Sequence, residues 1–182
     1  MEDSKSQVIV LSLVEKMEGR NSWCGETHIQ KSLYFLQEML RVPTNFDFIL
    51  YKHGPFSFEL RDELAAMRGN MILELHSNPY PYGPSHSPGQ SADKLKQLYP
   101  KTATQYEQQI NFIAEKFSEL RVAQLERLAT ALYVSLEDGR SESVESRAVH
   151  INKLKPHVTI EQAKEAVKEV DALWVEVERF LN

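Results

Sequence analysis

Cysteine is scarce and long apolar runs are lacking in this 182-residue sequence, and we expect no secretory leader. The single cysteine, Cys24, excludes an internal disulfide and a multi-thiolate zinc site within one monomer. The apolar run at residues 8–14 falls well short of the roughly 20 residues that a membrane-spanning helix needs. The N-terminus starts with acidic and polar residues, whereas a secretory signal starts with basic ones. We therefore expect a cytoplasmic protein without a membrane partner.

Motifs that carry catalysis or bind metals are lacking as well. The seven glycines never fall into the GxGxxG or GxxxxGK patterns that hold phosphates. None of the six histidines has a carboxylate ligand three or four residues away in the arrangement of a metalloprotease helix. His28 follows Cys24 closely enough to act as its base, but an ordinary loop thiol is the simpler interpretation. The sequence predicts a non-enzyme that has no catalytic residue, no metal site and no cofactor.

Positive charge is in deficit, because the formal net charge is −5 and the pI is about 5.7. Nucleic acids are bound mainly by Lys and Arg that neutralise phosphates, so this balance argues against a general nucleic-acid coat. The only local basic cluster is Lys94, Lys96 and Lys101, which are the candidate nucleic-acid contacts. An acidic chain of this kind fits a protein partner at least as well.

Helical periodicity is the strongest positive signal along the chain. Apolar residues recur every three or four positions before Gly19, again before Pro43, and over most of the chain from Thr102 onward. Capping boxes, in which a hydroxyl residue is followed three positions later by Gln or Glu, mark expected helix starts. These boxes are Thr27–Gln30, Thr104–Glu107 and Thr159–Gln162.

The pattern changes in the middle of the chain. Residues 46–52 are aromatic and β-branched, which is typical of a strand, and Gly54 and Pro55 then predict a sharp strand-to-helix turn. Ser57 is placed to cap the next helix, whose apolar face begins at Leu60.

A second strand is predicted at residues 71–75. It is followed by residues 77–91, which contain four prolines and should form an exposed loop or the tip of a hairpin. We expect the second arm of that hairpin around residues 94–99.

This order of elements is typical of a winged-helix domain, a helix-turn-helix variant with a hairpin wing. The expected fold class is mainly α with a small β component. We expect a winged-helix-like part at residues 1–100 with a Pro-rich wing, and a helical annex at residues 101–182. The broad apolar stripes of the annex should pack on the first part, as one compact unit, or on a second copy.

Two stretches carry a family resemblance: IQKSLYFLQ at residues 29–37 and YKHGPFS at residues 51–57. Together with the segment from Leu60 to Ile72, they resemble the Panacea or SocA-like antitoxin domain family over about residues 8–75. Ser32 departs from the aliphatic residue that is frequent in the family. The resemblance implies a bacterial or phage-derived, non-catalytic domain that neutralises a toxin in a toxin–antitoxin system. The motif residues that it carries over as a binding site are Lys31, Tyr34, Tyr51, Gly54, Pro55, Phe56, Ser57 and Leu60.

Two functional hypotheses follow from these features. The leading one is a protein-binding module, an antitoxin or regulatory subunit, with an exposed apolar patch beyond the roughly 300–600 Å² of an ordinary monomer. The alternative is a winged-helix transcription regulator that binds DNA, for which a homodimer is expected. Its recognition helix would follow Ser57, where three acidic residues against two basic ones weaken the DNA-binding hypothesis.

Overall fold

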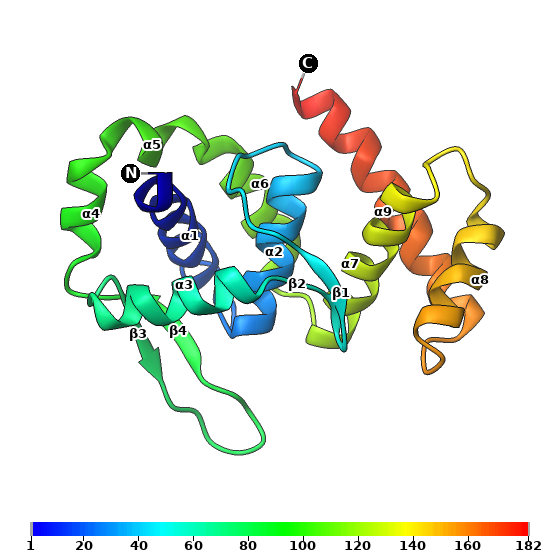
Figure 1. The fold of residues 1–182 in the computed structure, drawn as a ribbon, viewed down its shortest axis with the longest axis horizontal. Coiled ribbons are helices and arrows are strands. Elements are labelled where there is room, and N and C mark those ends of the chain that lie inside the picture. The colour runs from blue at the N-terminus through cyan, green and yellow to red at the C-terminus, as the bar shows by residue number, and fades with distance from the viewer. Residues whose placement is uncertain (1, 182) are drawn as a thin grey trace. The chain divides into compact units, whose positions relative to one another are not determined.

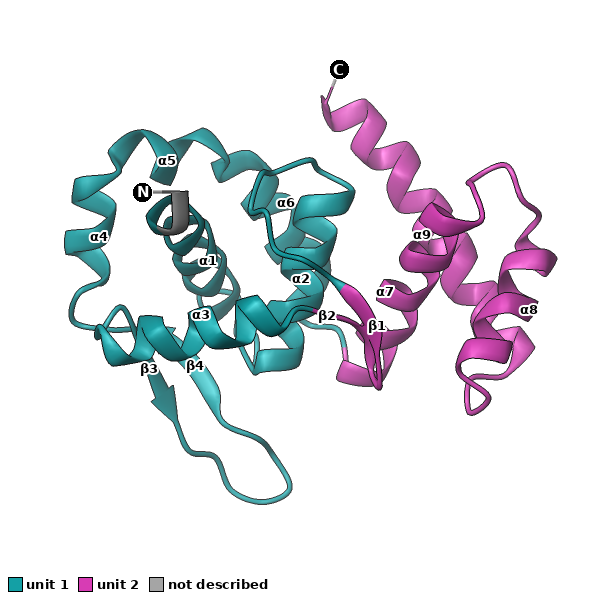
Figure 2. Cartoon of the chain, viewed as in Figure 1, with its two compact units in different colours: residues 1–48, 57–120 teal, residues 49–56, 121–182 magenta. Residues whose placement is uncertain are grey.

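The computed structural model describes residues 2–181 and is mainly α-helical with a small β component, which confirms the expected fold class. The chain forms two compact units (Figure 2). Unit 1 comprises residues 1–48 and 57–120, and unit 2 comprises residues 49–56 and 121–182. This division differs from the expected boundary after residue 100, because the helices up to residue 120 pack with the N-terminal ones.

Unit 1 is built around α1 (Glu2–Glu18), which packs against α2 (Glu26–Glu38) and α6 (Glu107–Phe117) (Figure 1). The rings of Phe35 and Phe117 meet edge to face at the α2–α6 contact, with 4.6 Å between their centroids. Three further helices belong to this unit: α3 (Phe58–Gly69), α4 (Ala92–Leu98) and α5 (Pro100–Gln105).

The start of α3 is fixed by Ser57, as the sequence predicts. Its hydroxyl accepts a hydrogen bond from the Leu60 backbone N–H at 3.2 Å. The buried Gln30 side chain holds Ser57 in turn, donating to its carbonyl oxygen and accepting from its N–H, both at 2.9 Å. The expected Thr27–Gln30 capping box is therefore wrong. Helix α2 begins at Glu26 behind Gly25, and the Gln30 amide is engaged elsewhere in unit 1.

The other two capping boxes had opposite outcomes. Thr104 lies inside α5, where its hydroxyl donates to the carbonyls of Pro100 and Lys101, so it does not cap α6. Thr159 and Gln162 do form the reciprocal pair at the start of α9 (Ile160–Leu181). The Thr159 N–H donates to Gln162 Oε1 at 3.1 Å, and the Gln162 N–H donates to Thr159 Oγ1 at 3.2 Å.

The strand predicted at residues 46–52 needs correction, whereas the one predicted at residues 71–75 is found as β3 (Leu73–His76). The first strand is only β1 (Ile49–Tyr51), and it pairs antiparallel with β2 (Gly54–Phe56), so Gly54 and Pro55 lie in a strand and the turn lies at residues 52–53. Gly54 has φ 87°, a left-handed conformation that favours glycine.

The second sheet is a separate hairpin in unit 1. Strand β3 (Leu73–His76) pairs antiparallel with β4 (Ser85–Pro88), and residues 94–99 are largely helical in α4 instead of forming the second arm. Pro88 is tolerated because it ends the strand, where a missing N–H costs little.

Unit 2 consists of the β1–β2 hairpin, α7 (Val122–Glu137), α8 (Val144–Leu154) and α9. Helices α7 and α8 both pack on the apolar face of α9, and β2 packs on α7. Arg147 is buried between the helices, where it forms a bidentate pair with Asp171 at 2.8 and 2.7 Å. In the part of the chain that the structure describes, no helix is both long and apolar enough to cross a membrane.

Candidate functional site

Half of the motif residues taken from the family resemblance form the core of unit 1. Lys31, Tyr34 and Leu60 are buried, and Ser57 caps α3. The Tyr34 ring packs edge to face on Phe48, with 5.1 Å between the ring centroids. These residues explain the fold around α2 and α3 and present little surface to a partner.

The other motif residues lie in the β1–β2 hairpin of unit 2. Gly54 and Pro55 are buried, Phe56 is half-buried, and Tyr51 is exposed. The rings of Tyr51 and Phe56 contact each other across the hairpin at 5.9 Å. The eight motif residues are therefore divided between the two units.

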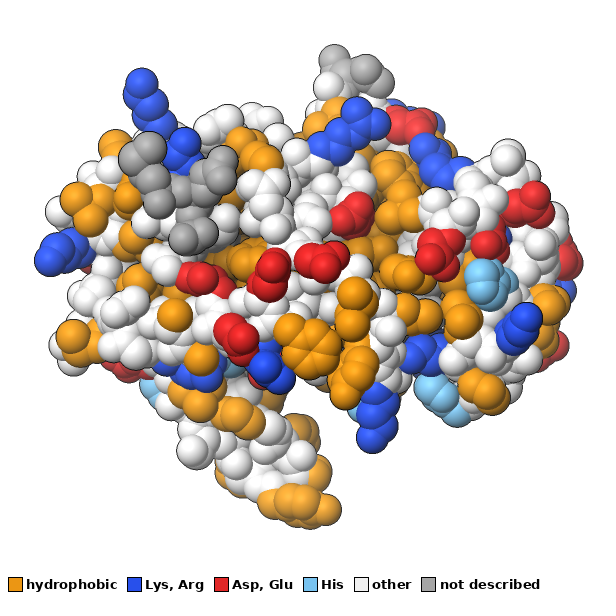
Figure 3. All heavy atoms as spheres, viewed as in Figure 1, with side chains coloured by type: hydrophobic (Ala, Val, Ile, Leu, Met, Phe, Trp, Pro, Cys, Tyr) orange, Lys and Arg blue, Asp and Glu red, His pale blue; other side chains and the backbone are white. Residues whose placement is uncertain are grey.

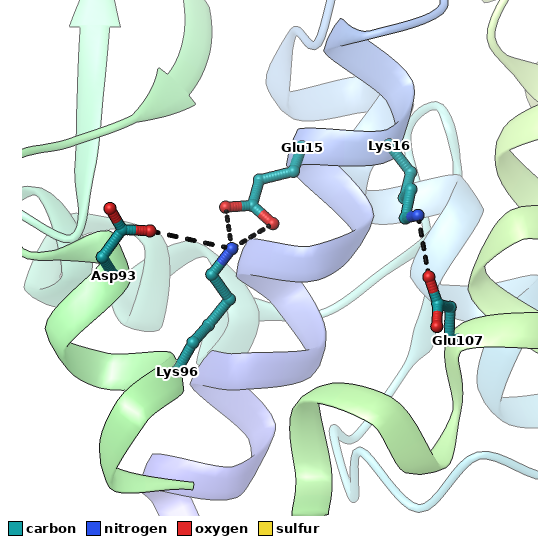
Figure 4. A network of polar contacts seen from close by, with 5 residues as sticks. All are labelled: Glu15, Lys16, Asp93, Lys96 and Glu107. Atoms are coloured by element: carbon teal, nitrogen blue, oxygen red, sulfur yellow. Dashed lines mark hydrogen bonds and ion pairs between the residues drawn. The ribbon is translucent and has the colours of Figure 1, made fainter. Parts of the chain in front are cut away.

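The basic cluster near α4 is partly neutralised within unit 1 (Figure 4). The Lys96 ammonium lies 2.8 Å from Glu15 and 4.0 Å from Asp93. Lys94 and Lys101 remain exposed, so the predicted cluster keeps only part of its positive charge for a nucleic acid.

Both arginines of α3 are also engaged inside unit 1. Arg61 pairs with Asp62 at 3.0 Å and stacks over the Phe58 ring at 5.1 Å. Arg68 contacts His86 Nε2 at 3.0 Å. A helix that reads DNA bases presents its arginines to the groove, whereas Arg61 and Arg68 have partners within unit 1.

The β3–β4 hairpin is a candidate binding site that the sequence did not predict. Residues 75–92 contain no Lys, Arg, Asp or Glu, a run of 18 uncharged residues in a chain that is 26% charged. The hairpin projects from the helices of unit 1 (Figure 1), and hydrophobic side chains gather at its end (Figure 3). The absence of charge over this run is the signal that could have identified it.

Aromatic side chains dominate the tip of this hairpin. Tyr80 is 97% exposed and Tyr82 is 61% exposed. Trp23, from the loop between α1 and α2, packs on the Tyr82 ring at 4.8 Å and is itself 37% exposed. Together, Trp23, Tyr80 and Tyr82 form what we call the aromatic tip.

Hydrogen bonds order the loop that carries the aromatic tip. The Asn78 amide donates to the Gly83 carbonyl at 2.9 Å and to Ser85 Oγ at 3.2 Å. The Tyr82 N–H donates to the Pro79 carbonyl at 3.0 Å, which closes a turn around the two tyrosines.

The base of the hairpin is tied to the core of unit 1. Ser85 forms an antiparallel bridge with Gly25, and the His86 N–H donates to the Cys24 carbonyl at 2.9 Å. At the end of β4 that lies farthest from the tip, the Gly89 N–H donates to the carbonyl of Ile72, the residue before β3, at 2.8 Å and so closes the hairpin. A Cβ on Gly89 would lie 2.4 Å from the Met71 carbonyl oxygen, so the closure needs glycine there.

The buried His86 ring links the hairpin to α3. Its Nδ1 lies 3.2 Å from the Cys24 carbonyl oxygen, and its Nε2 lies 3.0 Å from the Arg68 guanidinium. A neutral ring satisfies both contacts when Nδ1–H donates and Nε2 accepts. Burial lowers the pKa of His86, the Cys24 carbonyl opposes this effect, and the Arg68 charge adds to it.

Cys24 lies beside this contact as a buried, free thiol. Burial raises the pKa of Cys24 to about 11, against a smaller lowering by the Ser22 hydroxyl. The thiol is therefore protonated at neutral pH. His28, the base considered for it, contacts the Leu120 carbonyl oxygen at 2.8 Å through Nε2.

No protein-family model matches the chain, and no curated protein matches it at a significant level.

Proposed function

We propose that this chain is a non-enzymatic protein-binding module, an antitoxin or regulatory subunit, that contacts its partner protein through the aromatic tip. The observation that carries the proposal is the exposure of Tyr80 and Tyr82 at the tip of the β3–β4 hairpin, within an 18-residue uncharged run. An exposed apolar patch is what the leading sequence hypothesis expects.

The composition of the hairpin favours a protein partner. Tyr and Trp are enriched at protein–protein interfaces, where they supply large contact areas and a polar group, and charged residues are depleted at interface cores. The tip also has Asn78 and Gly83, residue types that adapt well to binding loops.

The same composition gives little support to DNA binding. A wing that contacts DNA releases counterions through Lys and Arg, and residues 75–92 contain neither. Arg61 and Arg68 on α3 and Lys96 on α4 are each held by contacts within unit 1.

The ordered loop should help binding. Because Asn78 and Tyr82 already form the turn through hydrogen bonds, little conformational entropy remains to be lost when a partner docks. The resemblance to the Panacea or SocA-like family makes a toxin encoded nearby the first partner to test. In this proposal the protein works in the cytoplasm, where the lone Cys24 stays reduced.

The test is a pull-down of the tagged full chain from its native lysate, washed at about 0.5 M salt to remove contacts that depend on phosphate charge. The double variant Tyr80→Ser/Tyr82→Ser removes both tyrosine rings. Leu98→Ser, which replaces a 65% exposed residue of α4 in the same unit, is the matched control.

We expect one stoichiometric protein to bind the wild-type chain and Leu98→Ser and to be lost by the double variant. With the purified partner, affinity should fall by at least about 30-fold, the effect of removing one interface hot spot of about 2 kcal/mol. Equal binding by all three proteins would reject the aromatic tip as the interface. Recovery of DNA alone, removed by the high-salt wash, would favour the transcription regulator.

A further inference from the structure

A pocket in unit 2 gathers cationic side chains from three segments. It lies among the β1–β2 turn, one face of α7, the α8–α9 connection and the first turn of α9, and its volume is about 180 Å³. The cations that line it are Lys52 of the turn, Arg127 of α7 and Lys155 of the connection. His53, Gly54, Glu126, His157, Val158 and Gln162 also line it.

Carboxylates leave most of this charge uncompensated. Among the residues that the structure describes, Glu126 is the only carboxylate that lines the pocket, and its Oε1 lies 3.5 Å from His53 Nδ1. Within residues 2–181, Lys52 and Arg127 form no ion pair. The pocket therefore keeps more positive than negative charge.

Lys155 is bound to the backbone instead of a carboxylate. Its ammonium donates to the carbonyl oxygens of Tyr51 and Lys52, the latter at 2.8 Å. Burial lowers the pKa of Lys155, and Glu126 opposes this effect. A bound anion would stabilise the charged form of this side chain.

We propose that this pocket binds the phosphoryl group of a small ligand. Lys52, Arg127 and Lys155 reach it from three segments, an arrangement that suits a tetrahedral, multiply charged oxyanion better than a planar carboxylate. The N-terminus of α9, close to His157 and Gln162, adds the partial positive charge of the helix.

The size of the pocket limits what enters it. Pockets that enclose a drug-sized ligand have volumes of roughly 300–1,000 Å³, so about 180 Å³ suits one phosphoryl group with the rest of its ligand outside. The phosphoryl group belongs either to the free phosphate ion or to a phosphate monoester. The pocket lies in unit 2 and the aromatic tip in unit 1, so this inference does not depend on the proposed function.

The test is a titration of the isotope-labelled full chain with inorganic phosphate, followed by NMR. Sodium chloride keeps the ionic strength constant, because screening alone changes the shifts of charged surfaces. Titration to about 10 mM would saturate a site with a Kd of about 1 mM. We expect saturable shifts at the Gly54 and Val158 amides, which line the pocket.

The double variant Lys52→Gln/Arg127→Gln should lower phosphate affinity by at least about tenfold, since each charge-assisted hydrogen bond contributes that much. Lys168→Gln/Arg179→Gln is the matched control, because it removes one exposed Lys and one exposed Arg of α9 outside the pocket. It should change the affinity less than about twofold. Lys52→Gln alone, at an exposed turn position, provides a milder variant if the double one unfolds.

Two further ligands distinguish the sources. Adenosine monophosphate that binds about tenfold more tightly than phosphate would assign the pocket to a phosphate monoester, and equal affinity would assign it to the phosphate ion. Acetate that binds as tightly as phosphate would overturn the phosphoryl assignment. The absence of saturable shifts, or equal losses in both double variants, would overturn the site itself.

Discussion

The two hairpins of this protein are built alike and held differently. The β3–β4 hairpin is tied down at its base, where the His86 N–H bonds to the Cys24 carbonyl and the Gly89 N–H closes the hairpin on Ile72, while Tyr80 at its tip is almost fully exposed. The β1–β2 hairpin is held at its turn, because Lys155 bonds the carbonyl oxygens of Tyr51 and Lys52. A hairpin held at its base can present its tip, whereas one held at its turn lines a pocket.

The two hairpins also differ in the residue types at their turns. One turn presents tyrosines in an uncharged run, and the other presents Lys52 and His53 beside further cations. Apolar aromatic surface favours protein contacts, and clustered cations favour anions. Each hairpin therefore supports a different kind of recognition, and substitutions that act on one and spare the other test the distinction.

The largest effect on stability is expected where the β1–β2 hairpin leads into α3. Gln30→Met keeps the side-chain volume but leaves the buried N–H of Ser57 unsatisfied. It also removes one of the two hydrogen bonds that the Ser57 carbonyl accepts, the other coming from the Arg61 N–H. We expect a loss of about 2–4 kcal/mol in the free energy of unfolding, measured by urea denaturation.

The control for this substitution is Gln108→Met, at an exposed position of α6. It should change the free energy of unfolding by less than about 0.5 kcal/mol. Equal stability of Gln30→Met and the wild-type chain would show that water replaces the Gln30 amide, and that Ser57 needs no side-chain partner.

A somewhat smaller effect separates the base of the β3–β4 hairpin from its tip. In Gly89→Ala the new Cβ would lie 2.4 Å from the Met71 carbonyl oxygen, so the backbone must shift, at a cost of about 1–3 kcal/mol. In Gly83→Ala the new Cβ meets nothing within 4 Å, and we expect less than about 0.5 kcal/mol. Thermal unfolding of both variants checks the pair, and equal losses would contradict a rigid base with an open tip.

Periodicity predicted the helices well because it reports which face is buried. The stripe from Leu60 through Leu64 to Met67 is fully buried in α3, and Ser57 caps that helix as expected. On α9 a similar stripe of apolar residues extends beyond the buried part of the helix. Val177 is buried, whereas Leu181 in the last turn is 48% exposed. A repeat of apolar residues cannot tell where the packing partner stops.

Capping boxes were predicted less reliably because their residues have other uses. A Thr followed by Gln or Glu three positions later fits both a helix start and a helix interior. Thr159 and Gln162 bond as predicted, whereas Gln30 reaches Ser57, which is 27 residues away in the sequence. Contacts of that range are not visible in a local pattern.

The candidate site was missed for a related reason. Four prolines indicated a loop, and this correctly placed an exposed tip between β3 and β4. The prolines did not predict the contact of Tyr82 with Trp23, which comes from a loop 59 residues earlier in the chain. The spacing of Lys52, Arg127 and Lys155 in the sequence likewise did not indicate that they line one pocket.

The smallest effect expected is a response to pH at His86 in the β3–β4 hairpin. The pKa of His86 is lowered from its ordinary 6.5, mainly by burial, so the unfolded chain takes up a proton at a higher pH than the folded one. The contribution of His86 to stability is therefore complete above pH 6.5 and is lost as the pH falls through the folded-state pKa. Protonation of Nε2 also ends its hydrogen bond from Arg68.

Urea denaturation at about pH 7.5 and about pH 5.5 measures this loss, and NMR titration of the His86 ring protons gives the folded-state pKa directly. His86→Gln should show a smaller difference between the two pH values. Lys155→Met, which alters the other hairpin and leaves the contacts of His86 with Cys24 and Arg68 in place, should keep the wild-type difference. A His86 ring that titrates at 6.5 or above would contradict the buried, neutral contact with Arg68, and with it the fixed base that distinguishes this hairpin.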